Sequence, residues 1–75
     1  MNKDFECKKL YAMLYKKGLD RFRVKGMVKI LYRMVGEYSL DACSVEQVQI
    51  FQDFINDMTT GQFDNLDKLK ILIEI

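Results

Sequence analysis

Four cationic side chains recur at intervals of four residues in one short stretch of the chain. Arg21, Lys25, Lys29 and Arg33 would form a single row if the stretch were an α-helix, since residues four apart lie on the same side. At 1.5 Å per residue the row is about 18 Å long, which is enough to follow several backbone phosphates. The stretch therefore predicts a cationic surface that faces nucleic acid, a protein or solvent alone.

Further lysines precede this row and widen the predicted surface. The complete cationic face that we expect is Lys8, Lys9, Lys16, Arg21, Lys25, Lys29 and Arg33. Phe22 lies within the row and Tyr15 lies near the lysines, and an exposed aromatic ring among cations can stack on a base or on a partner's side chain. The sequence pI of 7.7 weighs against nucleic acid, because domains that bind it usually exceed about 9.

An acidic surface is predicted in the second half of the chain. Glu46, Asp53 and Asp57 fall on one side of an expected helix, and Ile50 projects among them. An apolar side chain with a charged rim is typical of an interface anchor. We therefore expect Tyr15, Phe22 and Ile50 to be anchors for a partner.

The residues of most catalytic and metal sites are missing. The chain has no His, which removes the commonest general base and every Ser-His-Asp or Cys-His arrangement. It has only Cys7 and Cys43, too few for a zinc site with four Cys or His ligands. No glycine lies in a phosphate-binding pattern. The sequence predicts a protein that is not an enzyme and uses no cofactor or metal.

The size and composition predict one small soluble domain spanning residues 1–75. Of its 75 residues, 49% are hydrophobic and 31% are charged. The N-terminus has no apolar segment typical of a signal peptide, and the longest apolar run is far too short to span a membrane. We expect a cytoplasmic protein without a membrane partner. Small cores usually need a disulfide, a metal or oligomerisation. A Cys7–Cys43 bridge is possible, but both cysteines are better suited to be small buried thiols. Good helix packing, self-association as a homo-oligomer such as a dimer, or both are therefore predicted.

Charge is distributed unevenly along the chain. Residues 1–34 hold ten Lys or Arg against three Asp or Glu, whereas residues 35–75 hold two against eight. This asymmetry indicates a charged partner or charge-complementary self-association. The alternative is that the basic half simply lies beside the acidic half in one compact fold.

The elements that position these residues are predicted to be helices of about 3–17, 21–36 and 45–59. Gly18 is suited to the left-handed end of the first helix, and Asp20 is a ready N-cap for the second. Ser44, with Gln47 three residues later, forms a capping-box pattern before the third. The alternation over residues 21–25 also fits a short strand, but the cap signals favour helix.

The C-terminal segment 66–75 is compatible with two structures. Leu66, Leu69, Leu72 and Ile73 could form the packed face of a short helix, which we favour. Apolar and mostly polar residues also alternate over 68–75, as in a strand, and such a strand would pair across a dimer. The predicted fold class is therefore all-α, a small bundle of three helices plus a short C-terminal helix.

Apolar stripes at the helical period predict the core. In the second helix the stripe is Val24, Met27, Val28, Leu31, Met34 and Val35. Phe54 flanks the stripe of the third helix. Six large side chains fall outside the core stripes: Phe5, Tyr15, Phe22, Tyr32, Ile50 and Phe63. This surplus raises the odds of an interface.

These features predict a non-catalytic protein-binding module, a small regulator, inhibitor or adaptor that binds a partner protein and self-associates. The alternative is a nucleic-acid-binding regulator that uses the basic face of the first two helices. Salt dependence separates the two, since binding through phosphate contacts weakens steeply as salt rises.

Overall fold

The fold of the chain is helical, as predicted. The computed structural model describes residues 2–59, 61–63, 65 and 68. They form α1 (Lys3–Lys16), α2 (Arg21–Met34), a 3-10 helix η1 (Leu40–Ala42) and α3 (Val45–Asp57), and no strand occurs among them. The predicted small all-α bundle is confirmed, and each long helix ends one or two residues before its expected end.

Only part of the predicted C-terminal element can be compared with the structure. Residues 61–63, 65 and 68 are helical. The other residues of the segment 66–75 lie outside the described part of the chain. The choice between a complete helix and a strand over 68–75 therefore stays a prediction.

Side-chain caps explain where the helices begin. A carboxylate oxygen of Asp20 accepts a hydrogen bond of 2.9 Å from the backbone N–H of Arg23. Ser44 and Gln47 form the predicted capping box, with reciprocal hydrogen bonds of 3.1 and 2.9 Å. Each cap satisfies backbone N–H groups that have no partner within the helix.

The turn between α1 and α2 depends on glycine. Gly18 has a φ of +93°, a conformation that is costly for residues with a Cβ atom. The chain therefore reverses over only four residues, 17–20, and the last of these, Asp20, caps α2. Leu19 and Val24 stand at the N′ and N4 positions of α2, the spacing of a hydrophobic staple, and both are buried.

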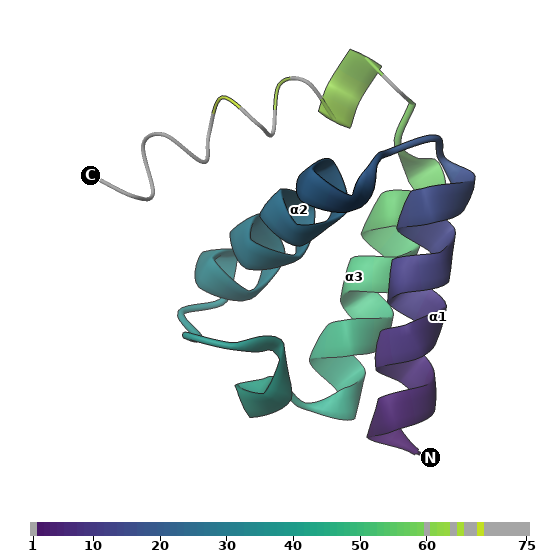
Figure 1. The fold of residues 1–75 in the computed structure, drawn as a ribbon. Helices are drawn as coiled ribbons and strands as arrows, with labels where there is room; N and C mark the ends of the chain where they lie inside the picture. Colours follow the sequence, from purple (N-terminus) through teal and green to yellow (C-terminus); the bar gives the residue numbers. More distant parts are fainter. Residues whose placement is uncertain (1, 60, 64, 66–67, 69–75) are drawn as a thin grey trace.

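α1 and α3 lie side by side and run in the same direction, whereas α2 diverges from them (Figure 1). α1 packs mainly against α3, and its contact with α2 is smaller. α2 starts near the C-terminal ends of the other two helices and slopes away, so its own C-terminal end is separated from them. The loop and η1 then bring the chain back to the start of α3.

Polar contacts fix the position of α1 on α3. The Gln52 side-chain amide donates to the backbone carbonyl of Glu6 at 2.9 Å and to its carboxylate at 2.8 Å. The Lys17 ammonium donates to the carbonyl oxygens of Asn56 and Met58 at 3.1 and 3.0 Å. These last carbonyls of α3 would otherwise lack a helical partner, so the end of α1 caps the end of α3.

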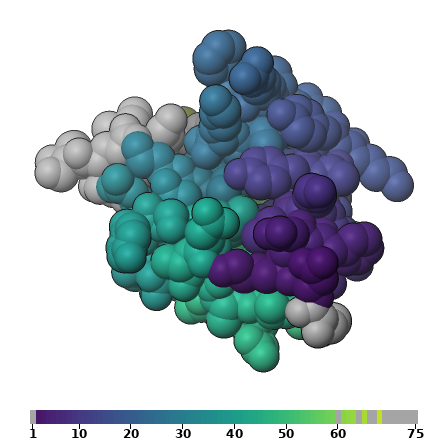
Figure 2. All heavy atoms as spheres, turned by 60° about the horizontal axis from the view of Figure 1, so that its bottom comes forward, coloured from purple at the N-terminus to yellow at the C-terminus, as the bar shows by residue number. Residues whose placement is uncertain are grey.

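The opposite end of α1 contacts the segment before α3. Lys3 donates a hydrogen bond from its ammonium group to the carbonyl oxygen of Asp41. Side chains at the start of α1, in purple, lie against teal side chains of the η1 region on the face shown in Figure 2. The N-terminus is therefore tied to the loop that leads into α3.

The buried core agrees with most of the predicted stripes but differs at several positions. Phe63, predicted to lie off the core, is fully buried. Met34 and Val35, predicted to be core residues, are exposed at 56% and 39%. The expectation was wrong because periodicity indicates which residues share a helix face but not how much of that face is covered. Ile30 and Gly26 are also buried, although they lie outside the predicted stripe of α2.

We predict that the Glu6–Gln52 contact is energetically coupled. Replacing Gln52 with Leu should lower the free energy of unfolding by about 2 kcal/mol, because it leaves a buried carboxylate without its donor. Urea denaturation of Gln52→Leu, Glu6→Leu and the double variant measures this. The double variant should lose clearly less free energy of unfolding than the sum of the losses in the two single variants. Simple additivity would contradict a direct interaction.

Candidate functional site

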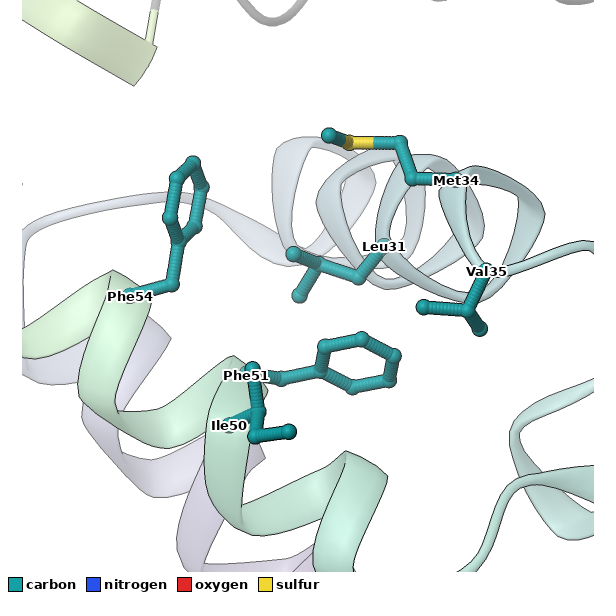
Figure 3. Close-up of a pocket in the computed structure, with 6 residues that line it drawn as sticks. All are labelled: Leu31, Met34, Val35, Ile50, Phe51 and Phe54. Atoms are coloured by element: carbon teal, nitrogen blue, oxygen red, sulfur yellow. The ribbon is translucent and has the colours of Figure 1, made fainter.

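An apolar groove lies between the diverging parts of α2 and α3. Its cavity has a volume of about 190 Å³, and all of its lining side chains are apolar: Leu31, Met34, Val35, Ile50, Phe51 and Phe54. Leu31 and Met34 belong to α2, Val35 is its C-cap residue, and the other three belong to α3 (Figure 3). Leu31 and Phe51 point into the space between α2 and α3. The ring of Phe54 rises from α3 at the edge of this space.

The floor and the rim of the groove differ in exposure. Leu31 and Phe51 are buried and belong to the core. Ile50, Met34, Phe54 and Val35 are exposed at 62%, 56%, 40% and 39%. A single exposed apolar residue is ordinary, but four around one hollow form a continuous patch. Patches of this kind mark contact sites for proteins or other apolar ligands.

The size of the groove limits what can enter it. An apolar cavity of about 150 Å³ is large enough to hold benzene, and the groove at about 190 Å³ is slightly larger. It therefore has room for one aromatic or branched side chain. A small-molecule site usually needs at least about 300 Å³, so a protruding side chain of a protein is the better fit.

The acidic residues predicted on α3 lie next to this groove. Asp53, Asp57 and Glu46 are three, seven and four residues from Ile50, so they share its side of the helix. All three are exposed. The structure thus combines two features that the sequence predicted separately, an apolar anchor at Ile50 and an acidic face around it.

The predicted cationic face is mostly exposed but is not uniformly free. Lys8, Lys9 and Lys16 on α1, and Arg21, Lys25 and Arg33 on α2, are exposed, whereas Lys29 is half-buried. Lys29 and Arg33 each interact with another group of the chain. Two of the four cations in the α2 row are therefore already engaged, which reduces the charge available to a ligand.

Two of the predicted anchors lie away from the groove. Phe22 is 82% exposed and Tyr15 is also exposed. Neither lines the groove, whereas Ile50 does. Sequence reasoning missed Met34, Val35 and Phe54 as site residues because each lies on or beside an apolar stripe, where burial is the normal expectation.

The two thiols are poorly suited to nucleophilic chemistry. Both cysteines are free, Cys43 is buried and Cys7 is partly buried. Burial raises the pKa of both thiols above the usual value. Because the thiolate is the reactive form, a raised pKa leaves less of it at neutral pH. The predicted alternative of a Cys7–Cys43 bridge is not present.

The described residues contain neither a metal-binding cluster nor a helix suited to cross a membrane. No group of three or more side chains there could bind a metal ion. None of the helices formed by these residues combines the length and the apolar character needed to cross a membrane.

Comparison of the chain with protein-family models, with curated proteins and with solved structures found no match. Its function must therefore be inferred from the geometry of the groove and of the charged surfaces.

We predict that the rim of the groove contributes little to folding. Ile50→Ser should change the free energy of unfolding by no more than about 0.5 kcal/mol, since exposed substitutions usually have small effects. Phe51→Ala should lower it by about 3–5 kcal/mol, because that ring is buried and its loss leaves a cavity. Urea denaturation followed by circular dichroism compares them. Equal losses would mean that the rim is part of the core.

Proposed function

We propose that the protein is a non-catalytic protein-binding module, a small regulator, inhibitor or adaptor that acts by holding a partner protein in the α2–α3 groove. The observation that carries the proposal is the apolar groove with Ile50, Met34, Val35 and Phe54 exposed on its rim. Self-association, which the sequence also predicts, stays a prediction.

The energetics favour a partner that covers the rim as well as filling the groove. Burying an aromatic side chain removes roughly 150–250 Å² from water, which is worth about 4–6 kcal/mol at 25 cal/mol per Å². Association costs at least about 4 kcal/mol in lost freedom of motion. One side chain alone therefore binds weakly, and the four exposed rim residues supply the further apolar contact that a stable complex requires.

Site-specific photo-crosslinking tests this function. A benzoylphenylalanine at position 50 should give a discrete adduct with a partner protein in cells, while the same probe at position 5 should not. Phe5 is the matched control because it lies on α1 and is exposed at 62%, the same fraction as Ile50. The purified partner should then bind Ile50→Asp at least about tenfold more weakly, as expected for an interface hot spot.

Identical adduct patterns at positions 50 and 5 would contradict the groove as the binding site. The same conclusion would follow if the purified partner bound Ile50→Asp and Phe5→Asp equally well.

A second candidate function is nucleic-acid binding through α1 and α2. It is supported by Phe22, which is 82% exposed and lies in the row of cations, as a base-stacking residue would. It ranks second because Lys29 and Arg33 already have interaction partners.

Fluorescence anisotropy of a labelled random DNA duplex tests this alternative. If it holds, binding is micromolar or tighter at about 50 mM salt and falls steeply towards 200 mM. Lys25→Glu combined with Lys29→Glu should abolish it. Absence of binding at low salt, or binding that survives this double reversal, would eliminate the cationic face as the nucleic-acid site.

A further inference from the structure

We infer that the segment held by the groove is a cationic amphipathic helix, one that inserts a bulky apolar side chain between α2 and α3 and places Lys or Arg against the outer edge of α3. This inference rests on the proposed function and adds the chemistry of the partner. It follows from the charges around the groove, since the apolar lining alone does not select among apolar partners.

The edge of the groove formed by α3 is acidic along its length. Glu46, Ile50, Asp53 and Asp57 follow the three- and four-residue spacing of a helix face. They cover about three turns, roughly 16 Å at 1.5 Å per residue. A partner that reaches the groove across α3 must therefore pass three carboxylates.

These carboxylates are available to a partner. The side chains of Glu46, Asp53 and Asp57 are all exposed. Cations elsewhere in the chain have partners, as at Lys3, Lys17, Lys29 and Arg33. The acidic edge thus presents exposed negative charge beside an exposed apolar rim, and such an edge attracts a basic partner and repels an acidic one.

A second copy of this chain fits the groove less well. A two-fold pair centred on the groove would bring the same surface of each copy together. The acidic edge of one α3 would then face that of the other, and like charges across an interface are unfavourable. The cationic residues of α2 do not line the groove, so they are not placed to neutralise it.

A helix is the partner structure that matches this arrangement. An amphipathic helix binds a groove through residues spaced three or four apart. The same spacing places Lys or Arg beside the inserted apolar residue, at the repeat that Asp53, Asp57 and Glu46 show around Ile50.

Two synthetic helical peptides provide the probes. One combines Leu with Lys, the other has Glu at every Lys position, and both carry one Phe at the centre of the apolar face. Fluorescence anisotropy of the labelled peptides measures their affinity for the full chain. We expect the Leu/Lys peptide to bind at least about tenfold more tightly at about 50 mM salt, with the preference shrinking as added salt screens the charges.

Matched variants separate the apolar contact from the charge. Ile50→Ser should lower the affinity for the Leu/Lys peptide about tenfold, and Phe5→Ser should leave that affinity unchanged. Asp53→Lys should reduce the preference for the Leu/Lys peptide about three- to tenfold. Asp4→Lys, an equal change of charge at an exposed residue of α1, should not. All four positions are exposed, and circular dichroism checks that each variant is folded.

The outcomes distinguish this inference from the proposed function. Equal affinity for both peptides, with both weakened by Ile50→Ser, would overturn the cationic partner and support the groove. Binding of the Leu/Lys peptide that Ile50→Ser and Phe5→Ser affect equally would overturn both. If neither peptide binds, the helical partner is wrong and photo-crosslinking at position 50 decides the function. A dimer in sedimentation that Ile50→Ser dissociates would identify a second copy as the occupant and overturn the inference.

Discussion

The parallel packing of α1 on α3 is the contact on which the rest of the structure depends. Apolar side chains drive it, but hydrophobic contact is not directional and does not by itself fix how one helix is placed along another. The buried Gln52 amide supplies that direction, since it reaches both the carbonyl and the carboxylate of Glu6. Lys17 repeats the constraint at the far end, where it caps α3. Polar groups removed from water must be paired, so few relative positions of the two helices satisfy both contacts.

This packing also explains why a groove remains open. The short turn at Gly18 starts α2 close to the C-terminal ends of α1 and α3. A helix that leaves such a corner at an angle can contact its neighbours closely only near the corner. Its far end, with Met34 and Val35, is held away from α3 and leaves apolar side chains in water. Exposed apolar side chains are also expected at this size, because small domains bury a smaller share of their surface than large ones.

The same arrangement assigns the two kinds of charge to different surfaces. The basic half of the sequence forms α1 and α2, and the acidic half contributes the outer side of α3 beside the groove. The exposed residues of the cationic face therefore lie on α1 and α2, whereas Glu46, Asp53 and Asp57 are exposed on α3. In the function that we propose, the apolar hollow and its acidic edge together select the partner. Electrostatic complementarity of this kind governs the rate and specificity of association more than its strength.

Local sequence determined the helices and their starts. Asp20, Ser44 with Gln47, and Gly18 act within a few residues of their own position, so their structural role could be predicted without knowing the fold. The charge of the α3 face could also be predicted, because it depends only on helical spacing. Ile50 was correctly expected to be exposed for the same reason.

Tertiary structure alone decided which apolar faces are covered. Met34 and Val35 continue the stripe that buries Val24 and Met27, yet they are exposed, while Phe63 lies off every predicted stripe and is buried. The difference arises from the angle at which α2 leaves the corner and from contacts between residues far apart in the chain, such as Glu6 with Gln52. Periodicity establishes that a helix has an apolar face, but the covering of that face depends on where other helices lie, and no local pattern contains that information.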